Sequence, residues 1–491
     1  MPYVELKLQP GLRNNGTPRQ AKGFWRESNL VRGYGDSIGP VPGWRSRTTT
    51  GASLSGSARA MLPWRDNSGA RWVGIGTHSN AFAMSSASVI TDITPAGFTS
   101  GITSATTTGG YGAGVYGSGA YGMPRTDTGT VTPATVWDLD LWGKDLLGCS
   151  EADGKIYTWD RNTANDFTAV TNAPTDAVGI IVTAELFLVA IKKNGVQWSD
   201  QGDNTVWTPA ADNQAGDKDA QTSGTFRCGR RVRGATLIFS DVDVWAMTYR
   251  GGVFVYDFLP VGSGCGTISK GSPISHDGRC FWMGDGNFWQ YNGGAITPLP
   301  CPVEEEVFAN LNTLQQSKVF AWHNALASEI WWHYPSLAST ENDSVVTWNY
   351  VTGEWWQHTV SRTCGHGAAG IFSLPLLIGS TTVYEHEVGI GWDSATPYAR
   401  TGPLELGAGD AVMNVSEIVG DEHTQGDASV VFFNRAFPNG TEVESSTYAL
   451  TQTPTSVRFT SRQTEAQVEF GAALDARMGD MRLNVQAGGR R

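Results

Sequence analysis

Short alternations of apolar and polar residues run along most of this chain of 491 residues. From about residue 60 to 395 a unit recurs: a short apolar strand, a turn rich in Gly, Asp or Asn, and a second strand that carries an aromatic residue. Five instances are WVGIGTHSNAFAM (72–84), LLGCSEADGKIYTWD (146–160), FWMGDGNFWQYNGG (281–294), VVTWNYVTGEWWQH (345–358) and LLIGSTTVYEHEVG (376–389). Turns such as Asp153-Gly154 and Asp285-Gly286 are of the kind that close hairpins.

Hairpins that repeat at intervals of tens of residues are typical of a β-propeller. One hairpin cannot bury its own apolar face, whereas a closed ring of small sheets buries every inner face and leaves few free edges. We therefore predict an all-β fold with a β-propeller over residues 56–395, of about six blades, with five or seven as alternatives. Trp159, Trp289, Trp332 and Trp355 are expected to pack between blades, each contributing on the order of 2–3 kcal/mol.

Two segments flank this repeat region. Residues 1–55 begin with one alternating strand and continue with a stretch dense in Gly, Pro and Arg, which predicts an arm that packs on another domain or subunit. From residue 396 the strands become longer, as in AVMNVSEIV (411–419) and ASVVFFNRAF (428–437), which predicts a C-terminal β-sandwich-like domain over 396–491. Residues 304–318 (EEEVFANLNTLQQSK) are the best helix candidate, with acidic residues in the first turn.

Composition supports this fold and narrows the function. The chain has 60 Gly and 19 Trp, while charged residues make up only 17% of it, as expected for many short strands joined by tight turns. The net charge is −12, and a groove that grips DNA phosphates needs a basic field. The chain is therefore a poor candidate for a sequence-specific DNA binder, although it could form a wall past which DNA slides.

No metal, cofactor or redox site is predicted. The six cysteines are scattered without a CxxC pair, so we expect free, buried thiols in a protein made in a reducing cytoplasm; they are Cys149, Cys228, Cys265, Cys280, Cys301 and Cys364. His358, Cys364 and His366 lie close in sequence but lack a fourth ligand, and an exposed turn is the favoured interpretation. The N-terminus has no signal-peptide pattern, and no apolar run is long enough to cross a bilayer.

Catalytic motifs are also missing or weak. GGYGAGVYGSGAYG (109–122) contains GxGxxG twice, but without the strand and helix that a dinucleotide loop requires, so we expect a Tyr/Gly-rich loop at an interface. No GxSxG elbow occurs. SDQGDNTVW (199–207) resembles an Asp-box turn with irregular spacing, which is a structural feature of propellers, and Asp241 and Asp243 are expected on a solvated edge. We predict no catalytic residues and no enzyme activity.

Several stretches carry a family resemblance. GTPRQAKGFWRESNLVRGYGDSIGPVPGW (16–44) resembles the opening of virion structural proteins of short-tailed bacteriophages and related prophages. The closing part is similar too, in the segments 402–427, 437–442 and 481–491, and so are the segments 203–217, 254–270, 329–350 and 384–389 between them. The resemblance covers nearly the whole chain, and its motifs are architectural.

The resemblance implies the nozzle, or lower tail tube, of a podovirus-type tail. Such a protein forms a homohexameric ring below the portal and its adaptor, retains packaged DNA and conducts it during ejection. The implied partners are other copies of the chain, the adaptor, tail fibre or spike proteins, and double-stranded DNA that passes without sequence-specific binding; the implied location is the virion tail, after synthesis in the bacterial cytoplasm. One alternative is a tail-tip propeller that binds or hydrolyses host surface glycans, and another is a scaffold or minor capsid protein.

Overall fold

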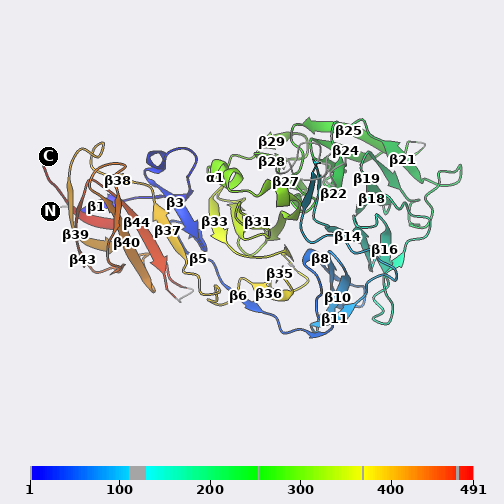
Figure 1. Ribbon diagram of the computed structural model, residues 1–491, viewed down its shortest axis with the longest axis horizontal. Coiled ribbons are helices and arrows are strands. Elements are labelled where there is room, and N and C mark those ends of the chain that lie inside the picture. The colour runs from blue at the N-terminus through cyan, green and yellow to red at the C-terminus, as the bar shows by residue number, and fades with distance from the viewer. Residues whose placement is uncertain (1–2, 110–128, 253, 368–369, 472–474, 490–491) are drawn as a thin grey trace, which may run out of the picture.

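Seven small, mainly antiparallel sheets follow one another along the chain and close into a ring. The computed structural model describes all residues except 1–2, 110–128, 253, 368–369, 472–474 and 490–491. In Figure 1 the ring of sheets lies on the right and a second β-domain, which holds both ends of the chain, lies on the left. The prediction of an all-β propeller fold is confirmed.

Each of the first three blades is a meander of four strands, and blade 1 has one extra edge strand. Blade 1 contains β8 (Ala58–Arg65), β9 (Arg71–Thr77), β10 (Ala81–Ser85) and β11 (Val89–Asp92), with β7 (Thr50–Gly51) at its edge. Blade 2 contains β14 (Trp137–Trp142), β15 (Asp145–Ser150), β16 (Ile156–Trp159) and β17 (Thr168–Ala169). Blade 3 contains β18 (Ala177–Val182), β19 (Leu188–Lys192), β20 (Gly195–Trp198) and β21 (Gly216–Asp219).

The next three blades repeat this order. Blade 4 contains β22 (Phe226–Val232), β23 (Ala235–Ser240), β24 (Asp243–Tyr249) and β25 (Tyr256–Ser263). Blade 5 contains β26 (Ile274–His276), β27 (Arg279–Met283), β28 (Phe288–Tyr291) and β29 (Ile296–Pro298). Blade 6 contains β30 (Phe320–Asn324), β31 (Glu329–Tyr334), β32 (Ser344–Asn349) and β33 (Trp355–Thr359).

Blade 7 joins distant parts of the sequence. It combines β34 (Cys364–His366), β35 (Leu376–Gly379) and β36 (Thr382–His386) with β6 (Trp44–Ser46), which pairs with β36. The first strands of successive blades contact one another in order, and β34 contacts β8 to close the ring. The described residues thus form seven blades, one more than the favoured six, because a blade completed by residues 44–46 does not show as a full repeat along the sequence.

Tryptophan packing follows the prediction at three of the four positions. Trp159, Trp332 and Trp355 are buried, whereas Trp289 is half-buried. Trp159 of blade 2 meets the edge of Trp72 of blade 1, with ring centroids 5.3 Å apart. An aromatic residue on the second strand of a hairpin therefore does fill the space between two blades here.

The segment before the propeller contributes strands to both domains. It contains β1 (Tyr3–Leu6), β2 (Gln9–Leu12), the 3-10 helix η1 (Pro18–Ala21), β3 (Phe24–Asn29), β4 (Val31–Tyr34) and β5 (Ser37–Pro40), followed by β6 and β7. β1 pairs with β45 (Met481–Ala487) and β3 with β37 (Tyr398–Thr401), while β6 and β7 belong to blades 7 and 1. This segment therefore threads through the molecule from end to end (Figure 1).

The C-terminal domain consists of two sheets that face each other. One has the order β1-β45-β39-β43 and the other β2-β3-β37-β44-β40-β41, with β38 beside β44 and β42 beside β40. The remaining bounds are β38 (Leu404–Glu405), β39 (Met413–Gly420), β40 (Ala428–Arg435), β41 (Glu442–Glu444), β42 (Tyr448–Ala449), β43 (Thr455–Ser461) and β44 (Gln463–Phe470). Ile418 and Leu483 from the first sheet pack with Phe432 and Val468 from the second, and this core continues into blades 5 and 6.

A buried ion cluster marks the junction of the two domains. Arg32 on β4 donates to Glu329 on β31 at 2.9 Å and to both carboxylate oxygens of Glu387 at 2.7 and 2.9 Å. All three side chains are at most 7% exposed. Because removing one partner would leave an uncompensated buried charge, this cluster fixes the β4–β5 hairpin to blades 6 and 7, while the shared core joins the two domains.

The predicted helix over residues 304–318 is broken in two. Only Glu304–Ala309 form an α-helix (α1), and Thr313–Lys318 form a 3-10 helix (η2). Gln315, Ser317 and Lys318 of η2 form hydrogen bonds with residues in the connection between blades 1 and 2. These tertiary contacts decide the conformation of residues 313–318.

Candidate functional site

The first strands of all seven blades enclose an axial channel. A cavity of about 360 Å³ lies in it, lined by residues of β8, β14, β18, β22, β30 and β34 and by residues 270–275 of blade 5. Its volume is at the lower end of the range for small-molecule pockets. The channel is therefore far too small to admit a DNA duplex.

One wall of this channel holds a group of buried charges. Asp138 and Asp140 on β14 each accept a backbone N–H from the neighbouring blade, from Ile180 at 3.1 Å and Val182 at 2.7 Å. Asp140 also pairs with Arg231 of blade 4 at 3.0 Å. Burial raises the pKa of both carboxyl groups, against the charges of nearby cations that lower it. These side chains tie three successive blades together.

Two cations complete this wall. The Arg230 guanidinium donates to the carbonyl groups of Gly229, Lys270 and Pro273, and lies 3.8 Å from Asp138. The Lys270 ammonium pairs with Glu151 at 2.9 Å. Burial acts to lower the pKa of Lys270, but the carboxylates of Glu151 and Asp138 outweigh it and raise the pKa. The charges on this wall therefore have partners within the protein, as expected for structural ties.

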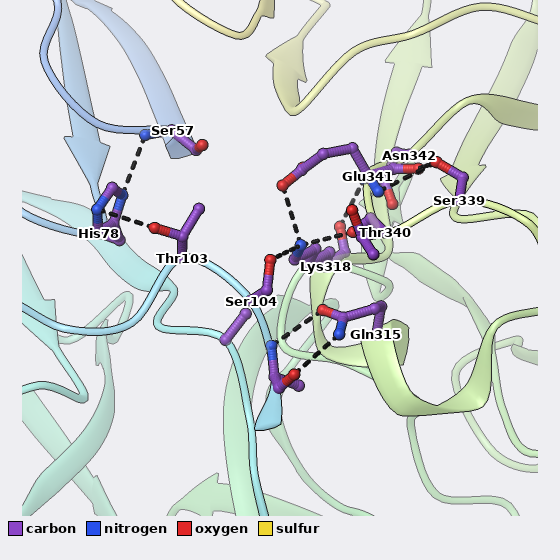
Figure 2. Close-up of polar contacts among 12 residues, drawn as sticks. Ser57, His78, Thr103, Ser104, Gln315, Lys318, Ser339, Thr340, Glu341 and Asn342 are labelled. Carbon is purple, nitrogen blue, oxygen red and sulfur yellow. Dashed lines mark hydrogen bonds and ion pairs between the residues drawn. The ribbon is translucent and has the colours of Figure 1, made fainter. Parts of the chain in front are cut away.

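One end of the ring carries a strap, which we define as residues 101–105 and 134–135. The strap belongs to the connection between blades 1 and 2, yet it is bonded to η2 of blade 6 (Figure 2). The Ala105 N–H donates to Gln315 Oε1 at 2.9 Å, and Gln315 Nε2 donates to the Ala105 carbonyl at 3.0 Å. The Ala134 N–H donates to Ser317 Oγ at 3.2 Å. The strap thus bridges blades that are separated by blade 7.

Three charged side chains hold the strap, and we call them the clamp: Arg59, Lys318 and Glu341. The Arg59 guanidinium donates two bonds of 2.7 Å to the Glu341 carboxylate and one of 2.9 Å to the Thr103 carbonyl. The Lys318 ammonium donates to Glu341 Oε1 at 2.9 Å, to the Thr340 carbonyl at 2.6 Å and to Ser104 Oγ at 3.0 Å (Figure 2). Blades 1 and 6 and the strap therefore meet at this point.

The pair Ser104–Lys318 has the composition of a nucleophile and its base, but the Lys318 nitrogen also contacts the Glu341 carboxylate and the Thr340 carbonyl. A catalytic base must hold a free electron pair, whereas Lys318 as an ammonium group finds an acceptor for each of its three protons, in Ser104, Thr340 and Glu341. Burial and the charge of Arg59 lower the pKa of Lys318, and the carboxylate of Glu341 acts against them. Burial raises the pKa of Glu341, but Arg59 and Lys318 outweigh it and lower the pKa. The geometry is that of a charged structural clamp.

His78 holds the strap from the side of blade 1. Its Nδ1 accepts the Ser57 N–H at 3.1 Å, and its Nε2 lies 3.1 Å from Thr103 Oγ1 (Figure 2). Burial and the charge of Arg59 lower the pKa of His78. The neutral ring can accept at Nδ1 and donate at Nε2, so both contacts are satisfied without a charge.

The residues considered for metal binding do not come together. His358 and Cys364 are buried rather than in an exposed turn, and His358 Nδ1 accepts the Leu30 N–H at 3.1 Å. Cys364 and His366 lie two residues apart on β34, and both line the axial channel. No group of three metal-binding side chains occurs among the described residues. The expectation of an exposed turn was wrong because this segment forms the outer strand of blade 6 and the inner strand of blade 7.

The remaining candidate motifs are turns. Asp203 accepts the N–H and the hydroxyl of Thr205, and the buried Trp207 donates its indole N–H to the Asn204 carbonyl at 2.7 Å. Asp241 and Asp243 flank the turn between β23 and β24, where Asp241 accepts the Thr225 N–H at 2.7 Å. The GxGxxG stretch lies outside the described residues, apart from its first position. All six cysteines are free and buried.

A cluster of histidines lies on the first strands of three adjacent blades, and sequence reasoning missed it. The rings of His276 and His323 are 4.2 Å apart, and His323 Nε2 lies 3.1 Å from the Tyr350 hydroxyl. Burial, His276 and His366 lower the pKa of His323 to about 4. No sequence spacing connects these residues, because each blade supplies one of them.

Comparisons with known proteins give only distant structural matches. No family model and no curated protein matches the chain. A streptogramin B lyase structure matches with 11% identity and a TM-score of 0.40, covering 68% of this chain and 95% of that one. A catalytically inactive variant of virginiamycin B lyase from Staphylococcus aureus with quinupristin matches with 9% identity and a TM-score of 0.38, covering 72% and 94%. A chain of the mitotic checkpoint complex matches with 10% identity and a TM-score of 0.41, covering 70% and 93%.

These distant structural similarities do not indicate an activity for this chain. What is shown is a β-propeller with a second β-domain. Among the described residues, no helix is long and apolar enough to cross a membrane.

Proposed function

We propose that this chain is a structural subunit of a bacteriophage tail, which assembles into a ring that retains packaged DNA and conducts it during ejection. The proposal takes its identity from the motif resemblance over nearly the whole chain. The structural observation that supports the proposal is the path of the N-terminal segment. Residues 3–51 supply strands to both sheets of the sandwich and to blades 7 and 1. A subunit bound together in this way can bear load without its domains separating.

The polar networks support a structural role. The charges of the channel wall and the clamp bond to backbone groups and to side chains of other blades. A catalytic site instead needs groups left free to bind and activate a substrate. We therefore expect the protein to act through its shape and rigidity and not by catalysing a reaction.

The conduit of such a ring would lie between copies and not within one propeller. The axial cavity of about 360 Å³ cannot hold a duplex. An acidic chain, with a net charge of −12, would repel DNA phosphates along the conduit and limit adhesion. The adaptor above and the fibres or spike below would be its further partners.

The glycan-binding alternative is less well supported. Sugar sites commonly offer exposed aromatic rings as platforms, but 15 of the 19 tryptophans are buried, and the exposed large aromatic residues among the described residues are the scattered Tyr3, Phe254 and Phe437.

The proposal is tested by locating the chain in the virion. Tails are purified, the chain is marked with an antibody or a fused tag, and its position is determined by electron microscopy. We expect label around the tail axis below the head; label around the head shell, or none on the particle, would contradict the proposal.

A further inference from the structure

Four asparagines of this chain are followed directly by glycine: Asn15, Asn194, Asn292 and Asn439. In such a pair the backbone nitrogen of the glycine can attack the side-chain amide carbon of the asparagine, because glycine has no Cβ to hinder the approach. A new C–N bond closes a succinimide ring, and the amide nitrogen leaves as ammonia with the proton of the glycine N–H. Water then opens the ring to aspartate or isoaspartate. Because the glycine N–H must give up its proton, a hydrogen-bond acceptor that holds this N–H opposes the reaction.

The fold protects the pair at Asn15. The Gly16 N–H donates to Glu305 Oε2 at 2.9 Å. Both ends of the asparagine amide are also held, since Nδ2 donates to the Cys301 carbonyl at 2.9 Å and Oδ1 accepts the Glu305 N–H at 3.1 Å. Neither the nitrogen that attacks nor the carbon that is attacked can move toward the other without breaking these bonds.

Two further pairs are protected by the backbone. The Gly440 N–H, which follows Asn439, donates to the Phe437 carbonyl at 2.9 Å. Gly195 lies in β20, opposite Lys192 on one side and Asp219 on the other. Ring closure at either position would require a turn or a sheet ladder to open first.

The pair at Asn292 differs from the other three. It lies in the exposed turn between β28 and β29, where no described residue accepts the Gly293 N–H. The Asn292 Oδ1 accepts the N–H of Gly294 at 3.4 Å and that of Ala295 at 3.2 Å. These two donors draw electron density from the amide carbon and stabilise the negative oxygen that forms on attack, as the donors of an oxyanion hole do. The turn therefore leaves the nucleophile free and polarises its target.

This turn also has room to change its conformation. Gly293 has a φ of +100°, and no atom beyond its chain neighbours lies within 4 Å of the position that a Cβ would take at Gly293 or Gly294. Glycine adopts a wide range of backbone angles without steric cost. The peptide can thus rotate into the geometry of attack without displacing another part of the protein.

We propose that Asn292 is the preferred site of deamidation in this chain, through a succinimide formed with Gly293. Conversion to aspartate adds one negative charge to the β28–β29 turn, and conversion to isoaspartate also lengthens its backbone by one carbon atom. Both products form without an enzyme, and water is the co-reactant. The modification is independent of the proposed function.

Peptide mapping of the folded, full chain tests this site. Purified protein is incubated at mildly alkaline pH, and mass spectrometry follows the conversion of amide to acid in the peptide that carries each Asn-Gly pair. We expect Asn292 to be lost about tenfold faster than any of the other three, because a hydrogen bond to the glycine N–H must otherwise be broken first. The chain unfolded in urea is the control, in which the four rates should converge.

Two variants check the chemistry of the turn. G293A should slow the conversion of Asn292, since the new methyl group hinders the attacking nitrogen, whereas G440A should leave it unchanged. Equal rates at the four pairs of the folded chain, or faster loss of Asn439, would overturn the inference. A preference for Asn292 that persists in urea would overturn it as well, because the fold would then play no part.

Discussion

The guanidinium of Arg59 and the carboxylate of Glu341 form a two-pronged ion pair, with both hydrogen bonds at 2.7 Å. Arg59 lies on the first strand of blade 1 and Glu341 in a turn of blade 6. The pair therefore spans blade 7, which is the blade completed by an N-terminal strand. It strengthens the propeller next to its point of closure.

Glu341→Gln should destabilise the protein, because Arg59 and Lys318 would lose the carboxylate that compensates their buried charges. We expect a loss of about 2–3 kcal/mol, less than the roughly 3–5 kcal/mol of a fully buried pair, since Glu341 keeps 37% of its side chain exposed. Urea unfolding measures it, with D285N at an exposed turn as the matched control. A loss no greater than that of the control would show that the clamp does not stabilise the ring.

Arg32→Met should loosen the junction between the domains. The substitution leaves Glu329 and Glu387 without their buried cation, and burial already raises the pKa of Glu329 against the charge of Arg32. We expect a loss of about 3–5 kcal/mol and faster proteolysis near residues 386–398. R71M, at an exposed arginine, is the control; unchanged unfolding and cleavage of R32M would contradict this role.

Removal of residues 1–46 should prevent cooperative folding. The truncation leaves blade 7 with three strands and deprives both sandwich sheets of strands. We expect loss of the near-ultraviolet circular dichroism signal and rapid proteolysis. Removal of residues 1–2 alone should have no such effect, and a folded truncated propeller would show that ring closure does not depend on β6.

Acid should destabilise the fold as the pH falls below the ordinary histidine pKa of about 6.5. Burial lowers the pKa of His358 to about 3, and burial with neighbouring histidines lowers that of His323 to about 4. The unfolded chain therefore binds protons before the folded one, so stability is full above about pH 6.5 and falls toward pH 4. Melting temperatures between pH 8 and 4.5 measure this decline. H358Q should reduce the slope, whereas H423Q, at an exposed position, should not; equal slopes would contradict the assignment.

Much of the fold could be predicted from local patterns, since hairpins with an aromatic second strand mark blades 1, 2, 5, 6 and 7 in the sequence. Blade 3 is less distinct because its inner strand, Ala177–Val182, is buried on both faces and does not alternate. The fourth strand of blade 7 could not be found, because residues 44–46 pair with a partner that lies far along the chain.

The clamp could not be predicted from the sequence either, because its residues also lie far apart along the chain. Arg59, Lys318 and Glu341 belong to no motif, and only the closed ring brings them together. The predicted helix over 304–318 failed at η2, where Gln315 and Lys318 bond to the strap. By contrast, the turn at Asp203 and Trp207 was predictable, because its contacts are local.

The most direct test of the proposed structural role is a symmetric reconstruction of the virion tail by electron cryomicroscopy. The account predicts that this two-domain fold fits density repeated around the tail axis, with copies in contact and DNA density passing between them. A tail in which the chain occurs as isolated copies, or surrounds no axial passage, would contradict it.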